Sequence, residues 1–204
     1  MDTVHTNINQ LEDNSLKAQR RRAAKPLLWV SIASMAMMFA GFTSGYVVSR
    51  TALVEEGRWM EFELPSIFWL STVVVLAISV VLHLAMRKIK ADDVSATKGL
   101  ILAALVLGLV FIGVQYLGYT ELYGSGIFFT GPGSNTAGSW VWLIIFFHLL
   151  HLIAGIIVLL VTFLRTNSGK YNSNNYLGID LCTTYWHFVD VLWIYLFIFL
   201  SIFR

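Results

Sequence analysis

Two pairs of ionisable residues stand three positions apart inside apolar stretches of this sequence. His187 and Asp190 lie in YWHFVDVLWIYLF, and His148 and His151 lie in HLLHLIAG. Residues three apart share one face of a helix, so the members of each pair can act together. A histidine–aspartate pair suits proton transfer, and a histidine pair suits metal binding. Either chemistry depends on the elements that position these side chains.

The composition indicates that these elements are membrane helices. Of 204 residues, 57% are hydrophobic and 13% are charged, whereas a soluble domain carries roughly 25% charged residues. The mean hydropathy is +0.70. The single cysteine, Cys182, excludes an internal disulfide and a multi-cysteine metal site. The net charge of +2 gives no indication of a nucleic-acid partner.

Five apolar segments are each long enough to cross the hydrocarbon layer, which is roughly 30 Å thick. Their length without alternation argues against a β-barrel. The predicted fold is an all-α integral membrane protein, a bundle of five transmembrane helices in residues 26–204, after a polar cytoplasmic tail in residues 1–25. The segments are approximately Leu27–Val48, Ser66–Met86, Gly99–Tyr119, Trp140–Leu164 and Leu181–Phe203.

The basic residues predict the orientation of this bundle. Only Arg50, Arg58 and Arg204 lie in the segments assigned to one side of the membrane. The cytoplasmic side carries an excess of lysine and arginine. The amino terminus is therefore expected in the cytoplasm and the carboxyl terminus in the periplasm. Eleven basic residues lie on the expected cytoplasmic side: Lys17, Arg20, Arg21, Arg22, Lys25, Arg87, Lys88, Lys90, Lys98, Arg165 and Lys170.

Polar residues at membrane depth cost roughly 2.5–3.5 kcal/mol when charged, so each is a candidate for function. One interpretation is a metal or haem site. His148 and His151 would share a small metal with His187 or Asp190, or one of them would pair with His187 across a haem. The remaining polar residues inside or near the segments are Gln115 and His83.

Two other interpretations remain open. His187 and Asp190 could belong to a proton or ion path, although both are placed in the early, cytoplasmic half of the last helix. An autonomous transporter would also be expected to contain paired broken helices or an inverted repeat. The third interpretation is structural: the pair fixes how helices dock, with aromatic side chains filling the junction. These aromatics are Tyr185, Trp186, Trp193 and Tyr195.

The stretch YWHFVDVLWIYLF resembles the start of the last transmembrane helix in subunit III of haem-copper oxidases. HLLHLIAG is similar to that family's H-x-x-H-x-x-x-G helix, and NSNNYLGIDL to its polar loop, where a carboxylate often stands at the place of Asp180. LPSIFWLSTVVVLAISVVLHLAM and SMAMMFAGF resemble two further helices, the former with His83 near its inner end. Gln115 falls where the family's next helix carries a glutamine. The resemblance covers the chain from about Leu27 to its end.

Two departures from the family pattern limit what can be carried over. Many members have seven helices, and this chain resembles the short, five-helix form. Met35 and Gly118 stand where members usually carry carboxylates, so no role of those acids is assigned here.

The resemblance implies a non-catalytic subunit of a respiratory cytochrome c or quinol oxidase in the bacterial inner membrane. Such a subunit stabilises subunit I and supports its proton uptake during oxygen reduction. No cofactor or active site is expected in this chain, and the haems and copper belong to partner subunits. Expected partners are subunit I by direct contact, subunit II and small subunits, bound phospholipids, and a respiratory supercomplex.

In this interpretation His187 and Asp190 order the cytoplasmic half of the bundle and buffer protons. His148 and His151 form hydrogen bonds between helices. The alternative is a small haem- or metal-binding membrane oxidoreductase built on His148, His151 and His187.

Overall fold

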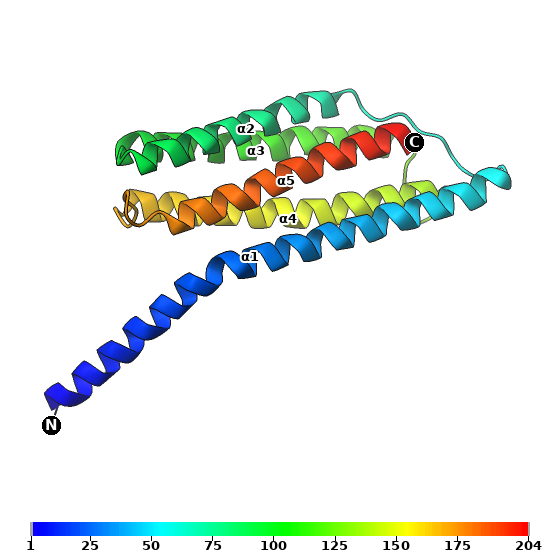
Figure 1. Cartoon of the computed structure of the whole chain (residues 1–204). Coiled ribbons are helices and arrows are strands. Elements are labelled where there is room, and N and C mark those ends of the chain that lie inside the picture. The colour runs from blue at the N-terminus through cyan, green and yellow to red at the C-terminus, as the bar shows by residue number, and fades with distance from the viewer. Residues whose placement is uncertain (1, 204) are drawn as a thin grey trace.

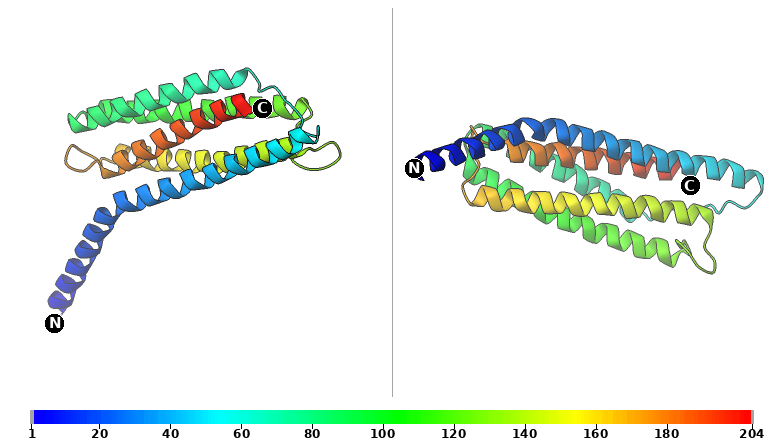
Figure 2. Two further views of the ribbon diagram at one scale, coloured as in Figure 1. Left: turned by 45° about the vertical axis from the view of Figure 1, so that its right-hand side comes forward. Right: turned by 90° about the horizontal axis from the view of Figure 1, so that it is seen from below.

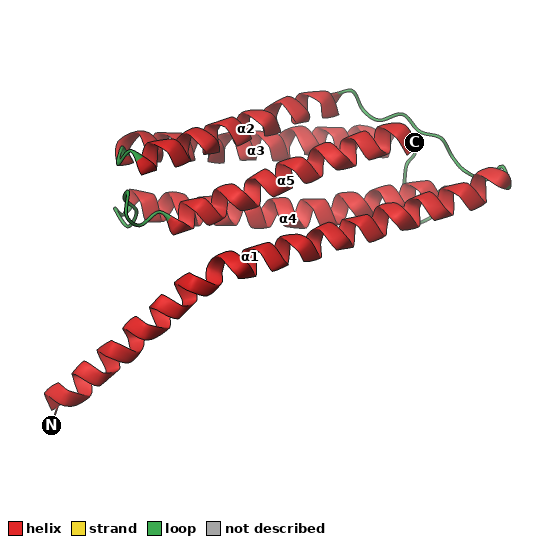
Figure 3. Ribbon diagram, in the orientation of Figure 1, coloured by secondary structure: helices red, strands yellow, loops and turns green. Residues whose placement is uncertain are grey.

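A computed structural model of the chain describes residues 2–203, with the side chains of residues 15, 16 and 18–203. It contains five α-helices joined by loops (Figure 3). All five are long and apolar enough to span a membrane, which confirms the predicted helical class and the number of spans. The helices are α1 (Asp2–Glu55), α2 (Ile67–Lys90), α3 (Val94–Gly124), α4 (Thr136–Asn167) and α5 (Leu177–Phe203).

Helices α3 and α4 each start several residues before the predicted apolar segment begins. The Asp93 carboxylate accepts a hydrogen bond from the backbone N–H of Ala96 at 3.0 Å. The side chain of Asn135 accepts one from Gly138 at 2.7 Å. Side chains of this kind satisfy the free N–H groups of a first helical turn. Each helix therefore begins at a polar cap outside its apolar segment.

Helix α1 crosses the predicted boundary between tail and first span. It begins at Asp2 and continues through Pro26, and the part suited to a membrane runs from Ala18 to Glu55. Proline inside a helix removes one backbone hydrogen bond and favours a bend. Figure 1 shows α1 bending within its dark-blue half, so that its first part projects away from the bundle. The predicted polar tail is thus a helical extension of the first span.

Helix α5 occupies the middle of the bundle. It packs against α1, α2 and α4, while α2 and α3 form a hairpin and α3 also packs against α4 (Figures 1 and 2). The α2–α3 and α4–α5 connections lie at the end from which α1 projects. The other two loops and the carboxyl terminus lie at the opposite end. Both basic loops are therefore at one end of the bundle.

Two apolar clusters fill the interior. One joins α2, α3, α4 and α5 around the fully buried Trp186 and Phe111. The other joins α1 to α4 and α5 around Phe39 and Tyr46. Close packing of this kind holds membrane helices together, because lipid removes the hydrophobic drive between them. The outer faces of the helices remain rich in exposed leucine, valine and isoleucine.

Candidate functional site

The two polar stretches that stood out in the sequence meet at the contact of α4 and α5. The hydroxyl of Tyr185 donates a hydrogen bond to the backbone carbonyl of His151 at 2.8 Å. The indole of Trp186 donates to the carbonyl of Gly155 at 3.1 Å. A Cβ atom on Gly155 would stand only 3.3 Å from the Trp186 ring. The glycine therefore lets the indole approach the α4 backbone, and α5 is fixed against α4 at this point.

His148 is buried inside the bundle, and its ring packs at a tilt against an aromatic ring of α5. Its ring centroid is 5.4 Å from that of Trp193, with 33° between the planes. The Trp193 indole donates to Thr72 of α2 at 3.2 Å, so this pair links α4, α5 and α2. His148 is only 1% exposed. Neither of its ring nitrogens has a hydrogen-bond partner among the described side chains and backbone.

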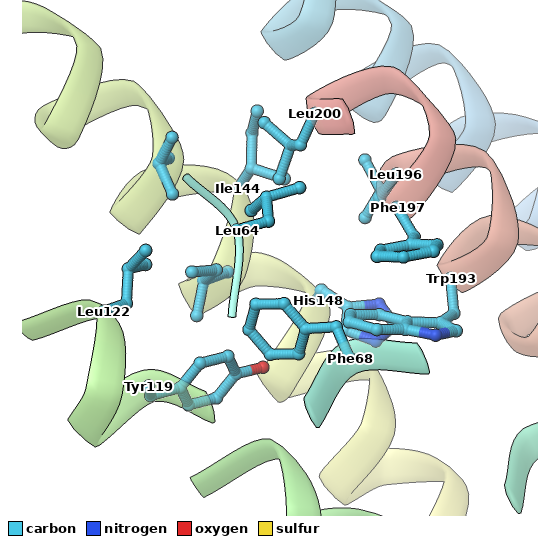
Figure 4. Close-up of a pocket in the computed structure, with 12 residues that line it drawn as sticks. Leu64, Phe68, Tyr119, Leu122, Ile144, His148, Trp193, Leu196, Phe197 and Leu200 are labelled. Atoms are coloured by element: carbon cyan, nitrogen blue, oxygen red, sulfur yellow. The ribbon is translucent and has the colours of Figure 1, made fainter. Parts of the chain in front are cut away.

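A small cavity adjoins this pair of rings, as Figure 4 shows. Its volume is about 20 Å³, room for roughly one water molecule. Leucine, isoleucine and phenylalanine side chains make up most of its lining, beside His148, Tyr119 and Trp193. Pockets for small molecules usually measure roughly 300–1,000 Å³. The cavity is therefore too small to be a substrate pocket.

His151 contacts a third helix through its ring. Its Nδ1 lies 2.6 Å from the carbonyl oxygen of Phe147, one turn earlier in α4. Its ring meets Phe39 of α1 edge-on, with centroids 5.6 Å apart. We predicted hydrogen bonds from His148 and His151 to other helices. In the structure both imidazoles reach their neighbouring helices through ring packing instead.

His187 and Asp190 lie at the contact of α5 with α2. The Nδ1 atom of His187 is 2.7 Å from the hydroxyl oxygen of Ser79 on α2. The same nitrogen is 4.0 Å from Asp190 Oδ2, beyond hydrogen-bonding distance. His83 follows Ser79 by one turn on α2 and is exposed. We call Ser79, His83, His187 and Asp190 the α2–α5 polar cluster.

The two acid–base residues of this cluster differ in burial. The His187 side chain is 37% exposed and that of Asp190 is 4% exposed. Neither oxygen of the Asp190 carboxylate has a hydrogen-bond partner within residues 2–203. At 1.5 Å per residue, His187 lies roughly 15 Å and Asp190 roughly 20 Å along a helix of about 40 Å. Asp190 is therefore at the midpoint of α5, deeper than the early half where we expected it.

The remaining predicted residues are dispersed. Gln115 is completely buried on α3, and neither atom of its amide group has a hydrogen-bond partner in the described part of the chain. Asp180 lies at the start of α5 and forms an ion pair with Lys25 of α1, with Nζ 2.6 Å from Oδ2. Sequence reasoning missed both Lys25 and Ser79. Ser79 could have been found, because it stands four residues before His83 and so shares its helix face.

The three histidines proposed for a metal or haem site point to different helices. His148 packs on α5, His151 on α1 and His187 on α2. Across the described residues, no three His, Cys, Asp or Glu side chains come together in a way that could hold a metal ion. The described residues therefore offer no metal site built from three such side chains.

The two positions that lack the expected carboxylates have different surroundings. Met35 is partly buried on α1. A side chain on Gly118 would overlap the ring of Phe68 on α2. Gly118 is therefore required for the close packing of α2 against α3, and the bundle leaves no room there for a carboxylate unless Phe68 moves.

Comparison with known proteins gives consistent matches along most of the chain. The model of the family described as cytochrome c oxidase subunit III matches residues 27–204. Cytochrome c oxidase subunit 3 of Thermostichus vulcanus is 32% identical over 179 residues, covering 86% of this chain and 85% of that protein. The protein of the same name from Corynebacterium diphtheriae is 28% identical over 166 residues, covering 79% of each chain. The chain is thus similar to bacterial proteins of about its own length.

Proposed function

The chain belongs to the cytochrome c oxidase subunit III family, and from this premise we propose that it stabilises the catalytic subunit I and supports its proton uptake. The haems and copper of the complex would lie in partner subunits, and this chain would contribute no redox centre of its own. The basic loops at one end of the bundle support an inner-membrane orientation with the amino terminus in the cytoplasm. Oxygen reduction would thus take place beside this subunit and not within it.

The α2–α5 polar cluster is the observation that carries this proposal. A buried carboxylate without hydrogen bonds is costly, and groups of this kind at membrane depth face protein partners or water. Asp190 is buried without such a partner, while the neighbouring His187 remains 37% exposed. A subunit that packs over α2 and α5 would cover His187 and complete the surroundings of the pair.

The same cluster has the chemistry of a proton buffer. Imidazole is the side chain whose charge ordinarily changes close to neutral pH. His187 and the exposed His83 can exchange protons with the outside of the bundle, and the Asp190 carboxylate can accept a proton from within it. Ser79 holds the His187 ring toward α2 at 2.7 Å. The cluster would therefore supply protons to a partner that rests on this face.

The first experiment tests the assembly. The tagged chain is extracted in mild detergent, and its partners are identified by mass spectrometry and by a reduced-minus-oxidised spectrum. Co-purification of a large haem-bearing subunit with oxygen-reducing activity supports the proposal. A chain that emerges alone with its own haem or metal would establish the alternative oxidoreductase. A chain that emerges alone and without a haem or metal would contradict the proposal and leave an autonomous transporter as the function to test.

A second experiment tests the cluster. Asp190→Ala should weaken retention of this subunit in the complex by roughly 1–3 kcal/mol, because the group of the neighbouring subunit that would bond to Asp190 would be left buried without a partner. Asp190→Asn keeps the shape and removes the charge, so the assembled complex should lose turnover mainly at alkaline pH, where protons are scarce.

Asp93→Asn is the matched control, because asparagine also caps a helix well. Normal retention of the Asp190→Ala subunit would refute the stabilising role. An unchanged pH profile for assembled Asp190→Asn complex would refute the buffering role separately.

A further inference from the structure

Helix α5 packs against α1, α2 and α4, but one of its sides is not covered by any of them. Helices α1 and α2 flank this side and do not contact each other in the described part of the chain. Figures 1 and 2 show α5 lying between α2 and α1, on the side of the bundle away from α3. We call this side the open face of α5. Its residues are His187, Val191, Tyr195, Ile198 and Ile202.

The open face is a continuous stripe along the helix. Its members follow one another at intervals of three or four residues, which places them on one side of α5. From His187 to Ile202 the stripe is roughly 22 Å long, more than half of a hydrocarbon layer of roughly 30 Å. The four residues after His187 are between 44% and 67% exposed, whereas Trp186 and Leu196 on other sides of α5 are buried. A single ridge of this kind suits packing against one other helix.

A polar group at one end distinguishes this stripe from an ordinary lipid-facing surface. The Nδ1 atom of His187 is 2.7 Å from the hydroxyl oxygen of Ser79. The other ring nitrogen, Nε2, makes no hydrogen bond among the described residues, and it is not one of their fully buried polar atoms. It can therefore be reached from the open face. Hydrocarbon chains offer no hydrogen bond, so polar groups at membrane depth usually face protein or water. This nitrogen favours a protein partner over lipid.

Small side chains on the α1 flank leave room for a close approach. The hydroxyls of Thr43 on α1 and Tyr195 on α5 share a hydrogen bond of 2.8 Å, so Thr43 marks the side of α1 that meets α5. Ala36 and Ala40 stand seven and three residues before Thr43 and lie on the same side of α1. Both are exposed. Small residues at such positions let membrane helices pack closely.

We infer that one transmembrane helix of the haem-bearing catalytic subunit lies along the open face of α5, between α1 and α2, with a hydrogen-bonding side chain opposite Nε2 of His187. The apolar stripe seats this helix, and His187 fixes its position along α5. The inference rests on the proposed function, because it takes the catalytic subunit as the partner.

The test uses cells that make the tagged chain together with its partner subunits. The photoreactive residue p-benzoylphenylalanine is placed at Val191 or Ile198, and the membranes are irradiated before extraction. The linked products are then identified by mass spectrometry. Both positions should link to the haem-bearing subunit, and the linked peptides should come from one membrane helix of that subunit.

The matched control positions are Leu109 and Tyr116 on α3. Both are exposed in the isolated chain, as Val191 and Ile198 are. They lie at similar distances along α3, counted from the end of the bundle where α3 and α5 both begin. The same probe at these positions should link to lipid and not to the haem-bearing subunit.

Variants of His187 test the polar contact. His187→Leu should lower the fraction of the chain retained with haem by about tenfold, because the facing side chain of the partner would be buried without its hydrogen bond. His187→Gln keeps a hydrogen-bonding group and should restore most of the retention. Equal loss in both variants would assign the effect to damage within this chain and overturn the role of His187. Normal retention of His187→Leu would overturn it as well.

The crosslinks separate failure of the inference from failure of the proposed function. If the haem-bearing subunit co-purifies but the α5 probes link only to lipid, or the α3 probes link to it equally, the proposed assembly stands and the inference is wrong. If no haem-bearing subunit co-purifies with the unmodified chain, the proposed function fails and the inference fails with it.

Discussion

At the scale of single residues, the aromatic side chains of α5 work as hydrogen-bond donors to other helices. Tyr185 and Trp186 both donate to backbone carbonyls of α4, and Trp193 donates to Thr72 of α2. Buried tyrosine and tryptophan ordinarily need a partner for their polar atom. In this chain these hydrogen bonds fix the rotation of α5 about its axis and its position along that axis relative to α4 and α2.

Gly155→Ala tests this contact directly. The added Cβ would stand 3.2 Å from Tyr185 and 3.3 Å from Trp186, and Trp186 is fully buried, so it has little space to move. Overpacking of this kind typically costs roughly 1–3 kcal/mol. We expect the midpoint temperature of thermal unfolding of the detergent-solubilised protein to fall.

Gly113→Ala is the control for that variant. Apart from Gly113 itself, its chain neighbours and the backbone of its own helix, no atom lies within 4 Å of a Cβ placed at Gly113. Alanine is favoured over glycine in a helix by about 1 kcal/mol. The midpoint temperature of thermal unfolding of Gly113→Ala should therefore be unchanged or higher than that of the wild type. Equal destabilisation by both variants would mean that Gly155 has no special packing role.

The sequence predicted the site residues individually better than it predicted their partners. The spacing of His187 and Asp190 placed them on one face, and the structure brings their side chains to 4.0 Å. It could not show that Ser79 would take the His187 hydrogen bond, because that contact joins residues 108 positions apart. The sequence also could not show which of His148 and His151 contacts α5 and which contacts α1, because these contacts depend on how whole helices pack.

At the scale of elements, an ion pair ties the projecting helix to the bundle. Lys25 of α1 and Asp180 of α5 are 2.6 Å apart, and their side chains are 58% and 27% exposed. An exposed pair contributes little, roughly 0.2–1 kcal/mol. Asp180 also lies in the first turn of α5, where a negative charge is favourable.

A double-mutant cycle with Lys25→Gln and Asp180→Asn should give a coupling free energy within that range, measured by chemical denaturation in detergent. The charge-reversed pair Lys25→Asp/Asp180→Lys should recover only part of it, because lysine is unfavourable at the start of a helix. Strictly additive single effects would show that the ion pair contributes nothing to holding α1.

A hydrogen bond joins the two basic loops, which are the α2–α3 and α4–α5 connections. Asp92 has a φ of 61°, a conformation that aspartate and asparagine tolerate better than most residues. Its Oδ1 accepts a hydrogen bond from the backbone N–H of Ser173 at 2.9 Å. This bond holds the pKa of Asp92 below its ordinary value of 3.8. The α2–α3 turn is thereby attached to the segment before α5.

The sign of the resulting pH dependence follows from that lowered pKa. The folded form favours the carboxylate, so the stabilisation is present above pH 3.8 and is lost as the pH falls through the lower folded value. We expect the Ser173 amide to exchange with deuterium faster under those acidic conditions, after correction for the intrinsic rate.

Asp92→Ala should show the faster exchange at every pH, and Asp92→Asn should show an intermediate rate without the acid transition. If the exchange rate of the Ser173 amide still rose at acidic pH in Asp92→Asn, a group other than Asp92 would be responsible for the transition.

The helix ends show which information a hydropathy pattern lacks. Apolar runs located all five spans, yet α3 and α4 begin at Asp93 and Asn135, outside those runs. Hydropathy reports the part of a helix that suits lipid, whereas capping decides where the backbone starts to coil. For α1 the difference was larger, because a polar helix adjoins the apolar one without a break at Pro26.

At the scale of the whole molecule, the basic loops share one end of the bundle, and the orientation in the membrane remains a prediction from this charge. It can be measured with single cysteines at the two ends, Asn174→Cys in the α4–α5 connection and Ser125→Cys in the α3–α4 loop, both exposed. An impermeant maleimide should label Ser125→Cys in intact cells and Asn174→Cys only after lysis.

The native chain serves as the blank for this labelling, because its Cys182 is buried. The opposite pattern would reverse the proposed orientation and place the α2–α3 and α4–α5 connections on the outer face.

The packing of α1 against α4 and α5, without α2 or α3, has a consequence for biosynthesis. Helix α1 is synthesised before α2 to α5, so it can pack against both of its neighbours only when α4 and α5 have been made. The α2–α3 hairpin can close early from local contacts, but α1 must wait in the lipid as a separately inserted helix. A nascent chain cut short before Leu177 would thus keep its hairpin and lack one of the two helices that receive α1. Complete attachment of α1 therefore requires that α5 has been synthesised.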